Sequence, residues 1–211
     1  MGVLRRMYEL GVRMMTLTWN HENELASPQR NPGGVLVPQT EKGLTGKGFE
    51  FLAEMERMHM IVDVSHLSDK GFWDIVEHGT RPFAASHPNC RALAPHTRNL
   101  TDEMIRALSE RGGIAGLNYY APFLDTDPTH PENCRSTVEL IAKHAAHYKQ
   151  VGGAQMIALG SDFDGIDGPH QLENAAFLPL LADALRKEDF TEDEVEGIYY
   201  RNAMRFFEEN L

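Results

Sequence analysis

The sequence predicts an α/β protein with parallel strands, and three observations lead to this fold class. Two short apolar runs, residues 61–65 and 82–86, have the length of buried strands. A segment typical of a helix, 69–78, lies between them, and Ser68 precedes it as a candidate N-cap. Strand, helix and strand in this order form a right-handed βαβ unit with parallel strands. The 211 residues, 42% of them apolar, are enough for a real core, and we predict a single domain over 1–211.

The remaining elements follow from apolar spacing and from capping residues. A helix is predicted over residues 3–10, and Gly11 suits the position after its C-terminus. Three further strands are predicted at 12–17, 113–118 and 156–160. A long polar loop covers 19–42, and loops of this length in compact domains are often functional. Helices are predicted at 45–59, from 101 onward, and at 138–151, 178–187 and 192–209.

Composition and charge exclude several classes of function. The net charge of −11 gives no electrostatic basis for binding nucleic acid or an anionic membrane surface. We find no apolar run that approaches the length of a membrane span, and Glu9 and Arg13 interrupt the apolar N-terminal stretch, which argues against a signal peptide. Cys90 and Cys134 form no CxxC motif, so reduced thiols in a cytoplasmic protein are expected.

Two histidines follow the two strands of the central βαβ unit. His66 comes directly after the first strand and His87 directly after the second. Because parallel neighbours end at the same edge of a sheet, the two imidazoles are expected to converge there, and in an α/β barrel this edge carries the active site. Two converging imidazoles suit a borderline metal such as zinc. The alternative is that each histidine simply ends a strand and bonds a carbonyl.

Other polar residues are predicted to lie at the same edge. Asp162 follows the last buried strand, where a carboxylate carries a desolvation cost, and it is the best candidate for proton transfer or metal ligation. Arg98 lies in the irregular loop after His87, where an arginine can hold a carboxylate with two hydrogen bonds. His21 belongs to a polar cluster of the 19–42 loop, for which substrate contact and simple solvation are equally open. His144 and His147 are expected to be surface histidines.

Four motifs then carry a family resemblance. VDVSHLS at 62–68, AASHPN at 84–89, HTRNLTDE around Arg98 and LGSDFDG at 159–165 resemble, in order and spacing, the membrane (renal) dipeptidase family, peptidase family M19. The resemblance covers essentially the whole chain. It implies a metal-dependent hydrolase of the amidohydrolase type with a (β/α)8 barrel. Such enzymes use two zinc ions to cleave dipeptides.

The resemblance also implies roles for individual residues. His66 and His87 match the histidines that bind the second zinc, and Arg98 matches the arginine that holds the substrate carboxylate. Asp162 matches the acidic residue that assists proton transfer to the leaving amine. Trp19 stands where the family often has a substrate-binding histidine, and His21, two residues on, is the candidate to replace it.

This sequence departs from the family pattern in its metal ligands and in its number of strands. It contains no His-x-Asp pair, which the family uses for the first zinc, and the chain begins after the place of the glutamate that bridges both metals. About five of the eight β/α units are found, so we expect a partial barrel, the C-terminal portion of a dipeptidase. Its exposed strand edges favour a homo-oligomer or association with the missing N-terminal part.

Two functions from different classes therefore remain. The first is a zinc-dependent dipeptidase, with little activity expected of these 211 residues in isolation. The second is a catalytically inactive, dipeptidase-like remnant that acts as a scaffold or a weak metal-binding protein, because two histidines alone make a poor zinc site. A different hydrolytic substrate is a weaker third interpretation.

Overall fold

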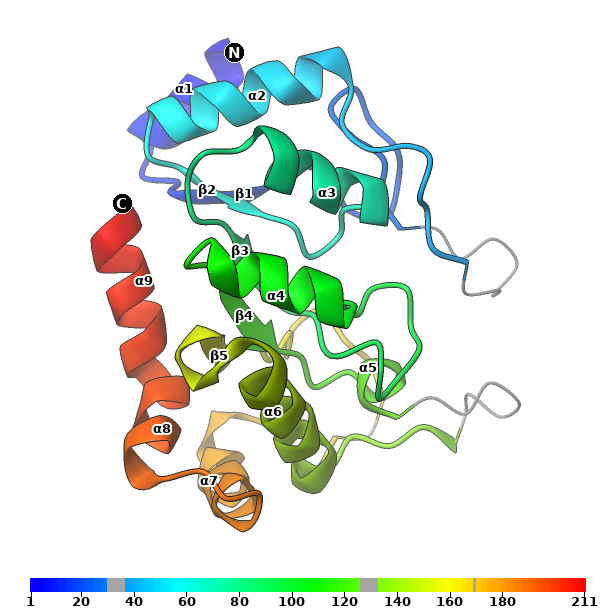
Figure 1. Cartoon of the computed structure of the whole chain (residues 1–211), viewed down its shortest axis with the longest axis vertical. Helices are drawn as coiled ribbons and strands as arrows, with labels where there is room; N and C mark the ends of the chain where they lie inside the picture. Colours follow the sequence, from blue (N-terminus) through cyan, green and yellow to red (C-terminus); the bar gives the residue numbers. More distant parts are fainter. Residues whose placement is uncertain (30–36, 126–132, 169) are drawn as a thin grey trace.

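In the computed structural model, five short parallel strands form one sheet, and helices lie between successive strands (Figure 1). The structure describes residues 1–29, 37–125, 133–168 and 170–211. Within these residues the strand order in the sheet is β1-β2-β3-β4-β5, so each strand pairs with its neighbour in the sequence. Every pair is parallel. The predicted α/β class and the five predicted strands are confirmed.

The strands are shorter than the sequence ranges predicted for them. They comprise β1 (Met14–Thr16), β2 (Ile61–Asp63), β3 (Ala84–Ala85), β4 (Ile114–Leu117) and β5 (Ile157–Leu159). Each lies inside its predicted range. The residues that follow β2 and β3 leave the regular ladder, and the Ser65 hydroxyl accepts the His87 N–H across the strand ends. That departure shapes the edge of the sheet where the candidate site lies.

The predicted helices are present, with small shifts at their ends. They are α1 (Gly2–Glu9), α2 (Gly46–Arg57), α3 (Asp69–His78), α4 (Asp102–Glu110), α6 (Val138–Gly152) and α7 (Leu178–Lys187). The Ser68 hydroxyl accepts the Gly71 N–H at 2.9 Å, which confirms the predicted N-cap of α3. Gly11 has a φ of +100°, a backbone conformation that glycine adopts readily, and ends the first helical segment as predicted.

The C-terminal helix predicted over 192–209 is divided into three parts. A π-helical turn, η5 (Gly197–Arg201), separates α8 (Glu192–Glu196) from α9 (Asn202–Asn210). The Asn202 side-chain amide donates to the carbonyls of Ala154 and Ile157 at 2.9 and 2.8 Å, which ties this turn to the start of β5. Three further short elements have too few residues for a periodic pattern to predict them. They are α5 (Ala121–Leu124) and the 3₁₀ turns η3 (Ala154–Met156) and η4 (Ala175–Phe177).

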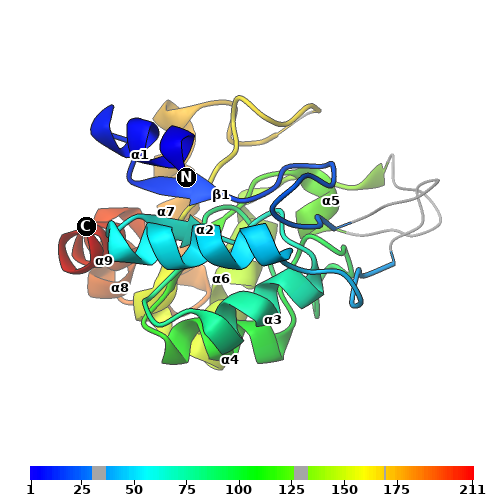
Figure 2. The same ribbon diagram turned by 90° about the horizontal axis from the view of Figure 1, so that it is seen from above.

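The two faces of the sheet are covered differently, because successive side chains of a strand point to opposite faces. Val62, Ala85 and Ala115 belong to the large core shared with the connecting helices, which lie side by side along one face of the sheet (Figure 2). Ile61 and its counterparts on the neighbouring strands form a second cluster with Phe206 of α9. Among the described residues, no helix combines the length and the apolar character needed to cross a bilayer.

Candidate metal and substrate site

The structure brings four of the five predicted site residues to the carboxyl edge of the sheet. His66 follows β2, His87 follows β3, Arg98 lies in the loop that begins after His87, and Asp162 follows β5. A cavity of about 670 Å³ opens at this edge, and His66, Arg98 and Asp162 line it. Side chains from the segments that follow β1, β3 and β4 complete its wall. These include Trp19, Asn20, His96, Tyr120 and Phe123.

The imidazoles of His66 and His87 face each other. Their Nε2 atoms are 3.0 Å apart and their ring centroids 5.0 Å apart. On the far side of each ring, Nδ1 contacts a side chain: Asn20 Oδ1 at 3.2 Å for His66, and Ser86 Oγ at 2.7 Å for His87. The convergence predicted from matching strand ends is therefore present.

Both imidazoles are held in the neutral form. Burial lowers the pKa of His66 to about 3, with further contributions from the charges of Arg98 and His87. Burial and then the Arg98 charge likewise lower the pKa of His87, against the opposing effect of Asp63. A neutral imidazole is the form that binds a metal ion. At neutral pH these two side chains are thus ready to act as ligands.

The donor set fits one divalent cation between the two rings. The protons can be inferred from the partners: Asn20 Oδ1 accepts from Nδ1–H of His66, and Arg98 Nη2, which can only donate, is 3.1 Å from Nε2 of His87. Each Nε2 therefore carries the lone pair of its ring; that of His87 accepts from Arg98 Nη2, and a cation bound between the rings would replace this hydrogen bond. Two imidazole nitrogens bound to one tetrahedral zinc at about 2.0–2.1 Å are about 3.3 Å apart, close to the observed separation.

Arg98 combines a structural contact with exposure to the cavity. Its Nε donates to the Ser65 carbonyl at 2.6 Å, and its guanidinium carbon lies 5.4 Å from the centre of the Phe123 ring. Burial lowers the pKa of Arg98 to about 10, and the charges of Asp63 and Asp162 oppose that shift. The side chain consequently stays cationic at neutral pH, as recognition of an anionic group requires.

Asp162 adopts a backbone conformation that is uncommon outside glycine. Its φ is +64°, in the left-handed region, which aspartate tolerates better than most residues. Asn118 Nδ2 donates to Asp162 Oδ2 at 3.1 Å, and a Cβ added at Gly165 would lie 2.3 Å from Oδ1. The turn after β5 therefore brings this carboxylate so close to residue 165 that only glycine, which has no Cβ, leaves room for it.

His21 lies apart from the other predicted site residues. It is exposed and does not line the cavity, and its ring packs edge-on against Trp19 with centroids 6.4 Å apart. Trp19 itself lines the cavity and lies 6.5 Å from the His66 ring. A substrate contact of His21 stays a prediction.

Sequence reasoning missed Asp63, whose buried carboxylate accepts hydrogen bonds from Ser65 and Ser86, the residues that precede the two histidines. Hydrogen bonds from Ser86 and Thr16 keep the pKa of Asp63 below its usual value although burial acts in the opposite direction. A signal was present, because an aspartate in the middle of an apolar strand is costly unless several donors surround it. His96 also lines the cavity, and burial followed by the charges of Arg98 and Arg91 lowers its pKa to about 4.

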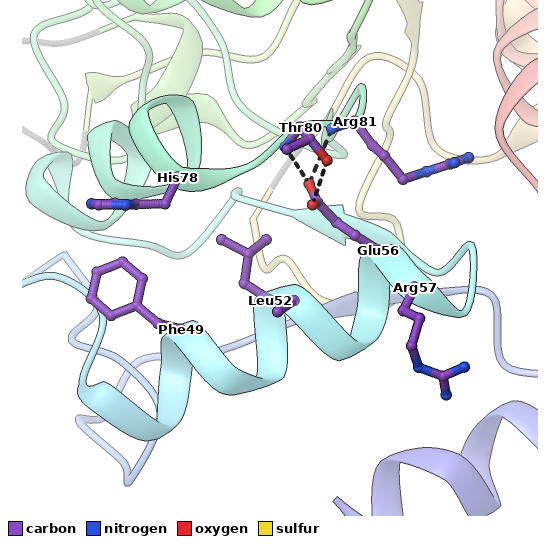
Figure 3. A pocket seen from close by; sticks show the side chains of 8 residues that line it. Phe49, Leu52, Glu56, Arg57, His78, Thr80 and Arg81 are labelled. Carbon is purple, nitrogen blue, oxygen red and sulfur yellow. Dashed lines mark hydrogen bonds between the residues drawn. The ribbon is translucent and has the colours of Figure 1, made fainter.

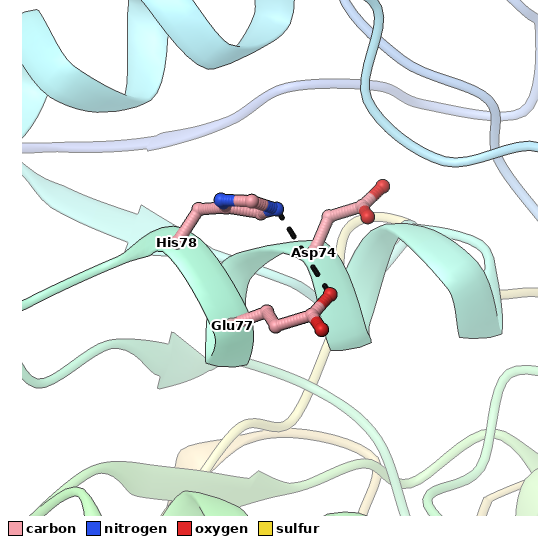
Figure 4. A group of neighbouring side chains, drawn as sticks. All are labelled: Asp74, Glu77 and His78. Carbon is pink, nitrogen blue, oxygen red and sulfur yellow. Dashed lines mark ion pairs between the residues drawn. The ribbon is translucent and has the colours of Figure 1, made fainter.

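A second cavity, of about 710 Å³, lies away from this edge (Figure 3). It is bounded by α2 and by the segment that joins α3 to β3, and the Glu56 carboxylate in it accepts hydrogen bonds from Thr80 and Arg81. Nearby on α3, three potential ligands, Asp74, Glu77 and His78, lie together (Figure 4). Asp74 is already bonded to Lys70 and to the Leu44 N–H, and the other two are exposed, so this group makes a poorer cation site than the histidine pair.

Comparison with known proteins assigns the chain to a family. Residues 1–210 match the family model described as membrane dipeptidase (peptidase family M19), and the chain belongs to that family. It is 36% identical to an uncharacterized protein in the pqqA 5′ region of Klebsiella pneumoniae, over 96% of this chain and 73% of that one. It is 34% identical to an uncharacterized dipeptidase of Schizosaccharomyces pombe, over 97% of this chain and 48% of the other.

A solved structure extends the comparison to three dimensions. The metallo peptidase from Rhodobacter sphaeroides, liganded with a phosphinate mimic of the dipeptide L-Ala-D-Ala, superimposes with a TM-score of 0.89 and 30% identity, over 99% of this chain and 59% of that one. The chain thus spans about half the length of the yeast relative and less than two thirds of this structure. The fold is the partial α/β barrel that the sequence predicted, and the family implies a metal cofactor.

The prediction that His144 and His147 are both surface residues is wrong for His144. His144 is only 1% exposed, because α6 packs against β4 and β5. Its Nδ1 accepts the Cys90 N–H at 3.0 Å and its Nε2–H donates to the Leu124 carbonyl at 3.0 Å. Burial lowers the pKa of His144 to about 4. His147 is partly exposed and bonds to Asp102.

We expect His144 to make the protein less stable in mild acid. Its pKa rises from about 4 in the folded chain to the ordinary 6.5 on unfolding, so its contribution is complete above pH 6.5 and is lost as the pH falls toward 4. Between pH 6.5 and pH 4 the free energy of unfolding of the wild type, measured with denaturant, should fall more steeply than that of His144→Asn. The difference should be up to about 1.4 kcal/mol per pH unit. Above pH 7 the two slopes should coincide. Equal slopes between pH 4 and 6.5 would contradict the assignment.

Proposed function

We propose that the protein is a metal-dependent dipeptidase in which this chain supplies two metal ligands, a carboxylate clamp and a proton-transfer group. The single observation that carries the proposal is the neutral His66–His87 pair, with its Nε2 atoms 3.0 Å apart, beside Arg98 and Asp162 at one cavity. Family membership adds support, as does the Rhodobacter sphaeroides relative, which holds a dipeptide mimic. Zinc is the metal we propose, because imidazole pairs and a catalytic open position suit it.

Each residue has a defined role in this proposal. His66 and His87 hold the cation through Nε2. When bound, such a cation supplies Lewis-acid activation of the scissile carbonyl and of the attacking water. Arg98 binds the free carboxylate of the dipeptide, and Asp162 takes the proton of the water and delivers it to the nitrogen of the leaving amine. We keep a supporting substrate contact of His21 as a prediction.

The remaining ligands of a two-metal centre are proposed to come from outside these 211 residues. The sequence contains no His-x-Asp pair, and two imidazoles are fewer than the three protein ligands of most catalytic zinc sites. A polypeptide that carries the missing pair is one candidate source; a second copy of the chain, which lacks that pair as well, can contribute only other side chains. A cytoplasmic location likewise stays a prediction.

Zinc content per chain tests the metal site. After dialysis against trace zinc, elemental mass spectrometry should find at least one zinc per chain, and His87→Ala should lose it. His78→Ala, which removes the imidazole of the exposed group on α3, is the matched control and should retain the metal. Two zinc ions with turnover of L-Ala-D-Ala would mean that other side chains of this sequence, from the same or a second copy, complete the centre. One zinc ion without turnover would mean that the missing ligands lie on another polypeptide. A chain that binds no zinc would contradict the proposal.

Dipeptide binding tests the substrate class without requiring turnover. The zinc-loaded chain should bind L-Ala-D-Ala measurably in calorimetry and its C-terminal amide much more weakly, because only the free acid can accept two hydrogen bonds from Arg98. Arg98→Lys keeps the charge but loses the paired geometry and should weaken binding about 10- to 100-fold. Arg106→Lys, on the exposed surface of α4, serves as control. Equal affinity for acid and amide would rule out the clamp.

A further inference from the structure

The Asp63 carboxylate is buried at the end of β2, where its side chain is surrounded by hydrogen-bond donors. It is 3% exposed. Its Oδ1 accepts from the backbone N–H of Ser65 at 3.2 Å, from the Ser65 hydroxyl at 2.9 Å and from the backbone N–H of Ser86 at 2.9 Å. Its Oδ2 accepts from the hydroxyls of Thr16 and Ser86, each at 2.7 Å. Because all five partners donate hydrogen bonds to it, this buried carboxylate is ionised and acts only as a hydrogen-bond acceptor.

Ser86 links this carboxylate to the His87 ring. Because its hydroxyl donates to Asp63, the lone pairs of its oxygen face His87 Nδ1 at 2.7 Å, and that nitrogen must carry the proton. The contact on the other side of the ring agrees, since Arg98 can only donate to His87 Nε2. Two independent contacts thus specify the same tautomer. The backbone N–H of His87 also bonds to the Ser65 hydroxyl at 3.0 Å, which fixes the start of the side chain.

We propose that Asp63 is a positioning residue that, acting through Ser86, fixes His87 in the tautomer with the proton on Nδ1 and the lone pair on Nε2. The inference rests on the proposed function for its purpose, because a lone pair on Nε2 is what a cation between His66 and His87 needs. Hydrogen-bonded partners of this kind commonly change the metal affinity of a site about 10- to 100-fold.

Replacement by asparagine should reverse the tautomer. Two backbone N–H groups, of Ser65 and Ser86, point at Oδ1 and cannot rotate, so the amide oxygen is held there and the NH2 group replaces Oδ2. The Ser86 hydroxyl then accepts from this NH2 and turns its own proton toward His87 Nδ1. The imidazole proton moves to Nε2, which then has no lone pair for a cation, and the hydrogen bond from Arg98 to that nitrogen is lost.

A purely structural role for Asp63 gives a different expectation. Asp63 joins β1 to the ends of β2 and β3, so its loss also removes hydrogen bonds between strands. Thr16→Val removes a donor from the same carboxylate oxygen but leaves the path from Asp63 through Ser86 to His87 intact. If the role of Asp63 is only structural, Asp63→Asn and Thr16→Val should have similar effects on stability and leave the His87 tautomer unchanged. If Asp63 sets the tautomer, only Asp63→Asn should change it.

The test reads the tautomer directly by ¹⁵N-histidine NMR of the metal-free 211-residue chain. His87 should carry its proton on Nδ1 in the wild type and in Thr16→Val, and on Nε2 in Asp63→Asn. Zinc affinity, measured by chelator competition, should fall about 10- to 100-fold in Asp63→Asn and stay unchanged in Thr16→Val. Should Asp63→Asn fail to fold, Ser86→Ala replaces it and should turn the single Nδ1–H tautomer into a mixture, because only the Arg98 contact then favours that form.

The outcomes separate this inference from the proposed function. A His87 proton that stays wholly on Nδ1 in both Asp63→Asn and Ser86→Ala would overturn the inference, and so would a Thr16→Val variant with the same change of tautomer as Asp63→Asn. A chain that changes tautomer as expected but binds no zinc would support the role of Asp63 and contradict the metal-dependent function instead.

Discussion

The hydrogen bonds of the Asp63 carboxylate connect the sheet to the site. They reach Thr16 on β1 and the residues that follow β2 and β3, so three neighbouring strands end around one buried negative charge. The Ser65 and Ser86 contacts place the two segments that carry His66 and His87. An uncompensated carboxylate in this position would be strongly destabilising, and the five donors offset its desolvation.

The charges around the cavity favour an anionic substrate and a divalent cation at the same time. Arg98 lies against His87 and helps to keep both imidazoles neutral, so the histidine pair carries no charge of its own. Asp63 and Asp162 offset the guanidinium and stabilise its charge. Because these groups are anchored to strand ends and to backbone carbonyls, the arrangement is largely set before any ligand binds.

The sequence predicts the strands and the convergence of the histidines because both depend on local pattern and on the geometry of a βαβ unit. Ser68 and the helix Asp69–His78 occur where capping and apolar spacing indicated. The π turn η5 could not be predicted in this way, since its place depends on Asn202 contacting carbonyls some 45 residues away. His144 was misassigned for a similar reason: α6 turns that histidine toward the Cys90 loop, a contact between segments distant in the sequence.

The site was predictable in part. His66, His87, Arg98 and Asp162 each follow a strand or lie in the loop at its end, so strand prediction alone brings them together. Asp63 lies within a strand, and its role depends on donors from three different segments. His21 and Trp19 are two residues apart on a loop without regular structure, so spacing cannot decide which of them faces the cavity. In the structure it is Trp19.

The position of a bound metal tests the account most directly. Crystals of the zinc-loaded chain, measured on both sides of the zinc absorption edge, would locate the ion by anomalous scattering. The account predicts one ion within about 2.0–2.1 Å of Nε2 of both His66 and His87. An ion held by the exposed group on α3, or by one imidazole alone, would contradict it.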